Sequence, residues 1–369
     1  MALPARPSNI PISVWSRIGR NLYQNRSHPV GIVSGLIHDH FKSLHGGSVF
    51  SSAPLPATPI VTIEQAFDNL LVPRNHVLRS PSDTYYVSAD TVLRPHATSH
   101  QRDVLQWLRS AKSSTSAGPT GAVWTCDVYR KDEVDKIHFP VFHQTDGVCV
   151  FNDSVDESEV VSDLEKSLES LVRHLFESSN KKPPSVRWDR TATFPFTHPS
   201  MELEIENSYG SWVECLGCGK IRTEIDANGW AFGIGIDRLA MLLFDIDDIR
   251  ALWSEDVRFT DQFRDGKVVK FKPFSKYPPT TRDIAFWQQP GEELDTAKFV
   301  CQAMSLAGPL GLESIALIDE FTHPKNGKRS RCFRLTYRGI ERTLTSEECN
   351  GIHAVVEEYV RDVVGGEIR

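Results

Sequence analysis

The stretch GWAFGIGIDRLAML, from Gly229 to Leu242, constrains the fold more than any other part of the chain. An apolar run passes two glycines, Gly233 and Gly235, and then becomes helix-like. It matches five of the six positions of a dinucleotide-binding G-x-G-x-x-G motif, but the sixth position is Arg238. That motif needs a third glycine for close packing of helix on strand, and an arginine obstructs this packing. We therefore disfavour a dinucleotide site and expect a glycine-lined strand that admits a flat ligand, with a cation at the helix start.

The spacing of the other apolar residues predicts an α+β protein. Helical spacing is found over 30–44, 101–112, 160–177 and 237–244. Strand-like runs cover 122–129, 141–150, 185–188, 201–205, 212–216 and 230–234. Because few of these runs alternate strand with helix, an antiparallel sheet with flanking helices is favoured over a doubly wound parallel sheet. A further mixture of strands and helices begins near residue 270 and is long enough for an independent small domain.

The composition is that of a soluble globular enzyme. The chain has 369 residues, of which 40% are hydrophobic and 24% charged. No apolar run approaches the ~20 residues that a membrane helix requires, so no membrane association is expected. The net charge of -7 does not suggest a polyanion partner for the whole chain, but residues 325–342 contain seven basic residues and one acid. Charge alone fits either phosphate contacts or a solvated basic hairpin.

The seven cysteines are odd in number and scattered, which favours a reducing compartment. Cys215 and Cys218 form a lone C-x-x-C without a second pair of ligands, so a packing role is favoured over a zinc or redox site. The first 38 residues contain four arginines and no acid, as in transit peptides. Segment 46–59 is rich in Gly, Ser and Pro and is interpreted as a linker.

A second constellation lies in VYRKDEVDKIHFPVFHQTDG, residues 128–147. Its apolar ends predict two antiparallel strands joined by a long polar loop. Arg130 and His138 lie where both could converge on a ligand, and Phe142 offers a face for stacking. An arginine fork suits a phosphate and an aromatic ring suits a base, whereas the alternative is a charged surface hairpin with one aromatic core residue.

Together these stretches resemble a known family. Residues 128–147 resemble motif 2 of class II aminoacyl-tRNA synthetases, and 229–242 resemble motif 3. The sequences of residues 67–86, 187–200 and 212–219 are similar to those of phenylalanyl-tRNA synthetases. Residues 271–287 and 317–344 resemble the ferredoxin-like anticodon-binding domain of the same enzymes. The presence of both parts on one short chain resembles the monomeric mitochondrial form.

The resemblance implies a class II antiparallel catalytic domain followed by a ferredoxin-like α/β sandwich. We expect a helical extension and linker over 1–58, a catalytic domain over 59–262, a hinge over 263–270 and an anticodon-binding domain over 271–369. The implied activity is that of a phenylalanine–tRNA ligase of the mitochondrial matrix. ATP and L-phenylalanine give phenylalanyl-adenylate, and the amino acid is then transferred to the terminal ribose of tRNA-Phe. A monomer without an obligate protein subunit is implied.

The resemblance also implies roles for single residues in binding ATP. Arg130 grips the α-phosphate and His138 lies near the outer phosphates. Phe142 and Arg238 lie on opposite faces of the adenine, with Gly233 and Gly235 beneath it. Arg130 and Arg238 are the expected catalytic residues. Mg²⁺ is the expected cofactor, with Glu214 and Glu202 as its candidate ligands and Glu214 as part of the ATP site.

For phenylalanine, the resemblance implies that Gln144 and Asp146 reach the ammonium group and that Phe194 and Phe196 stack on the ring. Ala231, next to Phe232, closes the pocket floor. The family commonly has glutamate at the position of Asp146, which implies a longer or water-mediated contact. The family's His-Thr-Ser stretch leaves Thr98 and Ser99 as rivals for one hydroxyl contact, and the expected neighbours in this stretch are His96, His100 and Gln101.

In the C-terminal domain the resemblance implies phosphate contacts with the anticodon stem-loop, and Tyr337 is an expected stacking neighbour. The candidate basic residues are Lys325, Lys328, Arg329, Arg331, Arg334 and Arg338. Two other classes of function stay open at this point. A module that only binds RNA is disfavoured because the chain has all five of Arg130, His138, Phe142, Gln144 and Arg238. A nicotinamide-dependent oxidoreductase is disfavoured because the chain lacks the βαβ frame that such a site needs.

Overall fold

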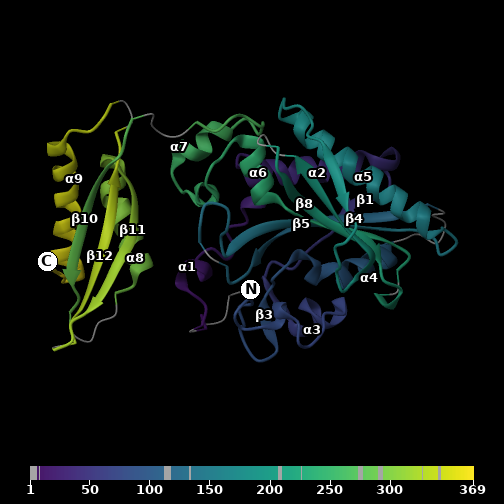
Figure 1. Cartoon of the computed structure of the whole chain (residues 1–369), viewed down its shortest axis with the longest axis horizontal. Coiled ribbons are helices and arrows are strands. Elements are labelled where there is room, and N and C mark those ends of the chain that lie inside the picture. Colours follow the sequence, from purple (N-terminus) through teal and green to yellow (C-terminus); the bar gives the residue numbers. More distant parts are fainter. Residues whose placement is uncertain are drawn as a thin grey trace. The chain divides into compact units, whose positions relative to one another are not determined.

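The computed structural model describes residues 6–7, 9–111, 118–132, 134–206, 210–225, 227–272, 277–289, 294–325, 327–339 and 342–369. The chain divides into two compact units, Met1–Phe271 and Lys272–Arg369 (Figure 1). Each unit has its own sheet and its own core. Lys112, the expected last residue of one helix, and much of the loop that follows it lie outside the described residues.

The first unit is built on a seven-stranded sheet in the order β1-β4-β5-β9-β8-β7-β6. All neighbouring strands are antiparallel except β1 and β4, which are parallel. The strands are β1 (Phe50–Ser52), β4 (Thr120–Tyr129), β5 (Val141–Val150), β6 (Val186–Asp189), β7 (Thr197–Glu206), β8 (Trp212–Ile221) and β9 (Gly229–Gly235). The predicted antiparallel sheet is thus confirmed, with strands that extend a few residues beyond the predicted runs.

The stretch interpreted as a linker, 46–59, contains β1 and so contributes to the main sheet. Phe50 explains why so short a strand is stable, because its buried ring lies 5.0 Å from that of Phe41 and covers Gly121. A Cβ on Gly121 would lie 2.3 Å from the ring of Phe50. The Gly, Ser and Pro content of the segment conceals this strand, because its pairing depends on a distant partner.

Helices α2 (Pro29–Ser43), α5 (Glu157–Ser178) and α6 (Ile236–Phe244) cover one face of this sheet, the back face. Helix α2 begins at a proline, which suits the first helical position, and His28 accepts a hydrogen bond from the amide of Val30. Helix α5 buries one apolar stripe against β8 and β9. Aromatic rings dominate the layer between: Phe232 of β9 stacks on Phe41 of α2 at 5.0 Å.

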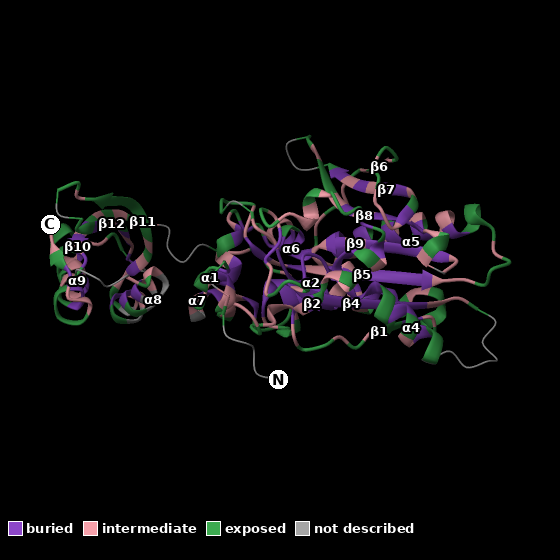
Figure 2. Cartoon of the chain, turned by 90° about the horizontal axis from the view of Figure 1, so that it is seen from below, coloured by how far each residue is buried: buried purple, intermediate pink, exposed green. Residues whose placement is uncertain are grey.

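The opposite face, the front face, is covered at the β4 end by α4 (Gln101–Ala111) and by the 3₁₀ turn η5 (Ala97–His100). Most residues of β4 and β5 are buried, as Figure 2 shows. The smaller elements of this unit are α1 (Ile12–Trp15), α3 (Ile63–Ala66), α7 (Val257–Thr260), β2 (Ile60–Thr62) and β3 (Thr91–Leu93).

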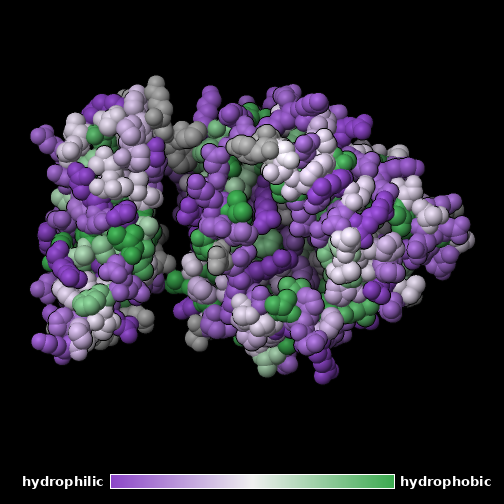
Figure 3. Space-filling model, in the orientation of Figure 1, coloured by the Kyte–Doolittle hydropathy of each residue, from purple (hydrophilic) through white to green (hydrophobic). Residues whose placement is uncertain are grey.

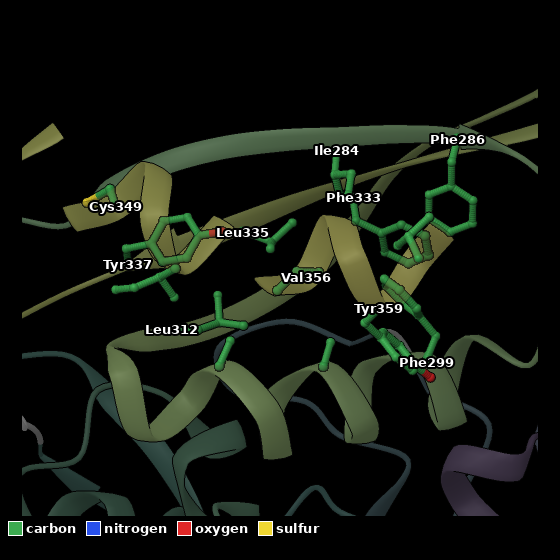
Figure 4. Packing of buried hydrophobic residues seen from close by; sticks show 14 residues of the cluster. Ile284, Phe286, Phe299, Leu312, Phe333, Leu335, Tyr337, Cys349, Val356 and Tyr359 are labelled. Carbon is green, nitrogen blue, oxygen red and sulfur yellow. The ribbon is translucent and has the colours of Figure 1, made fainter. Parts of the chain in front are cut away.

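The second unit has the element order βαββαβ. Its elements are β10 (Thr280–Trp287), α8 (Thr296–Ala307), β11 (Leu312–Thr322), β12 (Arg329–Tyr337), α9 (Ser346–Tyr359) and β13 (Glu367–Ile368). The antiparallel strand order is β11-β12-β10-β13. Both helices pack on one face of the sheet around a core that includes Phe286, Phe299 and Phe333 (Figure 4). This is the ferredoxin-like sandwich that the sequence predicts.

The segment expected to be a hinge, 263–270, is held at its end by the first unit. The amide of Phe271 donates to the carbonyl of Phe244 at 2.6 Å, and Lys270 lies 3.6 Å from Asp245. The boundary by contacts therefore falls after Phe271, close to the expected start of the second domain. Swinging of the second unit about this segment stays a prediction.

Replacing Phe232 by alanine tests the back-face core. The side chain is 3% exposed and stacked on Phe41, so its removal leaves a cavity and lowers the free energy of unfolding by about 3–5 kcal/mol. Urea unfolding measures this loss. The variant Phe232→Leu preserves most of the apolar volume and is expected to lose much less stability than Phe232→Ala. An unchanged stability in Phe232→Ala would contradict the placement of this ring in the core.

Candidate active site

The front face of the sheet is organised by the register between β5 and β9. Gln144 lies opposite Gly235, Asp146 opposite Gly233, and Val148 opposite Ala231. Directly paired residues in an antiparallel sheet share a face, so these six residues lie on the front face. Successive pairs are two residues apart, about 6.6–6.8 Å along the strands. The face thus offers three successive levels for a ligand.

Glycines form the floor beside these levels. On β8, Gly217 lies opposite Gly233, and Gly219 lies opposite Ala231. The ring of Phe194 covers Gly217, since a Cβ there would lie 2.8 Å from it. Phe194 and Phe196 stack on each other with centroids 6.0 Å apart. Phe194 therefore covers the glycine floor at Gly217, and Phe196, stacked on it, packs against the cluster that contains Val61 and Phe67.

Asp146 is the most unusual group in the site. It is 2% exposed, and burial raises its pKa to about 7, although the Thr98 hydroxyl and the charge of Arg130 act in the opposite direction. Thr98 donates from Oγ1 to one carboxylate oxygen at 2.6 Å. The other oxygen, Oδ1, is buried and has no hydrogen-bond partner among the described residues. A buried carboxylate with one unmatched oxygen favours a cationic partner such as an ammonium group.

The structure distinguishes the two rival hydroxyls. The Thr98 side chain is bonded to Asp146 and is partly exposed. Ser99, in contrast, is 2% exposed, and its hydroxyl lies 3.4 Å from Nδ1 of His96. The turn η5 directs successive side chains apart, so Thr98 stands at the site and Ser99 turns into the protein.

The other members of this stretch have different positions. The ring of His100 is bonded to Arg94, itself paired with Asp127 in the interior, so His100 is placed in the core rather than at the site. Burial lowers the pKa of His96 to about 3, with Arg130 contributing, so the ring is neutral at pH 7. Gln101 is 1% exposed, and its Nε2 has no hydrogen-bond partner in the described chain.

Arg130 and Phe142 stand at the end of the site nearest the β4–β5 loop. The Arg130 guanidinium lies 5.3 Å above the Phe142 ring, and its Nε donates to the carbonyl of Pro95 at 2.7 Å. Burial lowers the pKa of Arg130, and so does Arg238, whereas nearby carboxylates raise it. The two arginines are thus close enough to repel, which is typical of a site that binds anionic groups.

Asp237 fixes the position of Arg238. Its carboxylate accepts a hydrogen bond from the amide of His143 at 2.6 Å and lies 3.1 Å from Nδ1 of the same ring. Trp253 stacks on the His143 ring at 5.3 Å. We call these contacts of Asp237 with His143 the Asp237 clamp; it joins the first turn of α6 to β5. Arg238 is exposed, and no hydrogen bond or ion pair joins it to another described residue.

His138 lies in the β4–β5 loop, where Nδ1 is 2.9 Å from the Asp135 carboxylate. The amides of Ile137 and His138 donate to the same carboxylate at 2.7 Å. The hydrogen bond from His138 lowers the pKa of Asp135 to about 2. The loop is thus organised around Asp135, and the contact of His138 with phosphates stays a prediction.

Phe232 does not lie on the front face. It pairs with Gly147, and a Cβ on that glycine would lie 2.3 Å from its ring. The strand alternation that directs Ala231 to the front directs Phe232 into the back-face core. The same alternation places Val148 beside Ala231, and Val148 was not among the predicted site residues. Counting alternate positions along β5 from Gln144, through Asp146, reaches Val148, so the strand period alone could have identified it.

The predicted metal ligands lie on neighbouring strands. Glu202 pairs with Gly217, and Glu204 pairs with Glu214. Burial raises the pKa of Glu202, as do the charges of Glu214, Asp189 and Glu204. No group of three or more ligand side chains of metal-binding type occurs among the described residues. Two carboxylates with mutual repulsion fit Mg²⁺, which usually takes one or two carboxylates together with substrate phosphates.

The C-x-x-C cysteines are packing residues in the sheet. Cys218 pairs with Met201 and Phe232, and an odd spacing along β8 separates it in direction from Cys215. Burial raises the pKa of Cys215 to about 12 and that of Cys218 further. Neither thiol is ionised at pH 7, which disfavours a redox role.

Comparison with known proteins decides the family. The model described as "tRNA synthetases class II core domain (F)" matches residues 16–263, and that described as "Ferredoxin-fold anticodon binding domain" matches residues 275–369. The chloroplastic/mitochondrial phenylalanine–tRNA ligase of Arabidopsis thaliana is 43% identical over 98% of this chain and 83% of its own length. The mitochondrial phenylalanine–tRNA ligases of Mus musculus and Saccharomyces cerevisiae are 37% and 33% identical, over 98% and 95% of this chain and 86% and 89% of their own lengths.

The chain belongs to the phenylalanine–tRNA ligase family. It is therefore a class II synthetase, a ligase that forms aminoacyl-tRNA, as the sequence predicts. The names of these relatives also agree with the predicted mitochondrial location. Among the described residues, no helix has both the length and the apolar character needed to cross a membrane.

In the ligase's second unit, the structure separates the six predicted tRNA contacts into two groups. Arg331, Arg334 and Arg338 are engaged within the unit: Arg331 with Glu320 at 2.6 Å, Arg334 with Asp283 at 2.8 Å, and Arg338 with Glu313 at 2.9 Å. The other three, Lys325, Lys328 and Arg329, lie in and beside the β11–β12 hairpin; they are exposed, as Arg334 is, and Lys328 lies 3.4 Å from Glu367. Tyr337 is fully buried and bonded to His353 at 2.7 Å, so it is not placed to stack on RNA.

Replacing Asp146 by asparagine tests the buried charge. The folded pKa of about 7 lies above the ordinary aspartate pKa of 3.8, so this carboxyl destabilises the fold progressively as pH rises from about 4 to about 7. The variant is therefore expected to gain stability over the parent by ~2 kcal/mol more at pH 8 than at pH 5. Urea unfolding of the first unit at both pH values measures this difference. An equal difference at both pH values would argue against a buried ionised Asp146.

Proposed function

We propose that this chain activates L-phenylalanine with ATP and transfers it to the 3′-terminal ribose of tRNA-Phe. One observation carries the proposal: along β5 the chemistry of the front face changes in the order that an amino acid joined to a nucleotide requires. Arginines and Phe142 stand at one end, the buried Asp146 carboxylate at the middle, and Ala231 with Val148 at the other end. Membership in the phenylalanine–tRNA ligase family supports the same substrates.

At the nucleotide end, the residues bind and orient. Phe142 supplies a ring for the adenine, and the glycines at 233 and 235 let the base approach the backbone of β9. Arg130 is held by the carbonyl of Pro95 and by the ring of Phe142, so its fork is preorganised for the α-phosphate. Arg238, carried on the Asp237 clamp, approaches from the start of α6.

At the middle level, the amino acid is oriented through its ammonium group. Asp146 presents its unmatched Oδ1, and Thr98 keeps the other oxygen in place. One level away, the Gln144 Oε1 accepts a hydrogen bond from the amide of Ala97 at 3.2 Å, which fixes the side-chain amide. The second lone pair of Oε1 can accept from the substrate ammonium, whereas the NH₂ group can donate only to an acceptor such as the substrate carboxylate. Binding of an ammonium lowers the pKa of Asp146, so phenylalanine binding releases a proton near pH 7.

In the first chemical step, a carboxylate oxygen of phenylalanine attacks the α-phosphorus of ATP and pyrophosphate leaves. In the second step, a terminal ribose hydroxyl of the tRNA attacks the carbonyl carbon, AMP leaves, and the hydroxyl proton is lost to solvent or to the leaving phosphate. The chain contributes alignment and positive charge rather than acid–base catalysis. Glu202 and Glu214 would hold Mg²⁺, which neutralises phosphate charge when bound with the nucleotide.

We further propose that the enzyme works as a single chain in the mitochondrial matrix. The chain carries both the core and the anticodon-binding domain, and its relatives with this arrangement are named as mitochondrial. Light scattering of the purified protein tests the monomer: the mass of one chain is expected, with and without tRNA. A dimer that persists on dilution would contradict this part of the proposal.

Pyrophosphate exchange with each of the twenty amino acids tests the proposed function. Exchange is expected with phenylalanine in the absence of tRNA, because all side chains of the front-face site come from the first unit. Binding of tRNA without any exchange would instead indicate a module that only binds RNA. Arg130→Ala serves as the control for catalysis and is expected to reduce exchange by about 10²–10³-fold.

Enlarging Ala231 tests the apolar end of the site. The side chain is 4% exposed and packs with Val148, so the two extra methyl groups of Ala231→Val enter the space assigned to the benzyl ring. The KM for phenylalanine is expected to rise at least tenfold while the KM for ATP stays within about twofold. Ala231→Gly is the matched control that adds space and keeps exchange with phenylalanine. Equal changes in both KM values would place Ala231 outside the amino-acid pocket.

A further inference from the structure

The sheet of the second unit has one covered face and one open face. Strand β12 shows the division: Phe333, Leu335 and Tyr337 are buried against the helices, whereas Arg334 and Thr336 are not. The open face is in part a solvated surface of paired charge. Arg334 donates to both oxygens of Asp283 at 2.8 Å, in the middle of the sheet. This part of the face carries no unsatisfied cation for a ligand.

The opposite end of the open face is aromatic. Ser330 of β12 lies between Trp287 of β10 and Phe321 of β11 in the strand register. Because serine is small, the two rings meet above it, with centroids 6.0 Å apart. His323 lies 6.1 Å from Trp287 and 6.4 Å from Phe321. The guanidinium of Arg369 lies 5.4 Å above the Trp287 ring and 5.7 Å above that of Phe321.

We call Trp287, Phe321, His323 and Arg369 the aromatic platform. It remains accessible: Phe321 is 40% exposed, and Trp287 and His323 are partly exposed. Burial of an aromatic residue on folding is the usual outcome, so an exposed cluster at the sheet surface marks an interaction site. Figure 3 shows hydrophobic side chains over β11 and α8 of this unit; because α8 lies on the covered face, that group is distinct from the platform.

The positive charges beside the platform indicate which kind of partner the platform binds. The hairpin between β11 and β12 carries Lys325 and Lys328, and Arg329 begins β12 opposite Thr322. Lys328 lies 3.4 Å from Glu367, while Lys325 and Arg329 have no ion pair with a described residue. Exposed rings flanked by cations are suited to unpaired bases with their phosphates, since bases stack on rings and phosphates meet the cations.

We propose that the aromatic platform stacks unpaired bases of the tRNA anticodon loop, while the hairpin cations contact the flanking phosphates. The proposal rests on the proposed function, which supplies the RNA. It also replaces the sequence-based assignment of this surface: the cations that remain for RNA are those near the platform, and the stacking residues are Trp287 and Phe321 rather than the buried Tyr337.

Two short RNAs separate stacking from phosphate contact. The first probe is the anticodon stem-loop of tRNA-Phe, and the second has the same stem closed by a stable tetraloop. The parent protein is expected to bind the first at least tenfold more tightly than the second. Phe321→Ala is expected to remove most of this preference, because one stacked base is lost. Phe321→Trp, which restores a ring, is expected to keep it. Fluorescence anisotropy of labelled RNA measures each Kd.

Matched variants control for folding and for charge. Arg334→Ala removes an exposed cation elsewhere on the same face and is expected to change neither Kd by more than about twofold. Lys325→Ala is expected to weaken both RNAs equally and to reduce the salt dependence of binding. Circular dichroism melting of the full chain verifies that the second unit of each variant is folded.

Failure of this inference can be told apart from failure of the proposed function. Phenylalanine-dependent pyrophosphate exchange reports on the first unit and is expected to be unchanged in Phe321→Ala, while the KM for tRNA in aminoacylation rises. If exchange occurs but Phe321→Ala and Arg369→Ala keep the full preference for the open loop, the platform does not stack bases. That result overturns the inference even if the platform then proves to bind a protein. Absence of exchange in the parent would instead overturn the proposed function.

Discussion

The pairing of β5 with β9 is the constraint on which the rest of the first unit depends. It sets Gly235 beside Gln144 and Gly233 beside Asp146, so the polar side chains of one strand face a neighbour without side chains. A Cβ at Gly233 would already lie 3.0 Å from the Asp146 carboxylate. Slippage by one residue would direct the polar set into the back-face aromatic layer, where it has no partners. The packing of Phe232 on Phe41 therefore protects the register of the site, although neither ring lies in it.

Without a ligand, the site lowers the stability of the first unit. Burial of Asp146 with one unmatched oxygen, and the proximity of Arg130 to Arg238, both oppose folding when no ligand is present. The same features favour a substrate with an ammonium group at one level and phosphates at the next. The ammonium would pair with the Asp146 carboxylate, and the phosphates would reduce the repulsion between the two arginines. The back-face layer, with α5 and α2 packed on the sheet, supplies the stability that tolerates this arrangement.

Much of the fold and part of the site could be predicted from the sequence. Long periodic runs predicted helices and strands close to those observed. The resemblance to motifs 2 and 3 pointed to Arg130, Phe142, Asp146 and Arg238 as candidate site residues. Local alternation alone, applied more strictly, would have excluded Phe232 and added Val148. Other features depend on partners distant in the chain: the strand inside 46–59 pairs with β4, and Ser99 turns away because of the geometry of η5.

The basic stripe of the second unit shows the same limit. A count of arginines does not reveal which of them are paired, because Glu320, Asp283 and Glu313 come from other strands. Nor does the spacing of aromatic residues in β10 and β11 show that two of them meet over Ser330. Charge alone left this stripe open between phosphate contacts and a solvated hairpin, and it is the strand register that singles out the surface that we propose for RNA.

One consequence concerns the N-terminal segment. Ile10 and Val14 are almost fully buried, and the Arg17 guanidinium lies 5.0 Å above the Phe139 ring of the β4–β5 loop and 5.5 Å above Trp253. Trp253 in turn stacks on the histidine held by Asp237. Loss of the segment through Arg17 would therefore remove part of the support beneath the β4–β5 loop. Through Trp253 and His143, this end of the chain is in contact with the group that positions the first turn of α6.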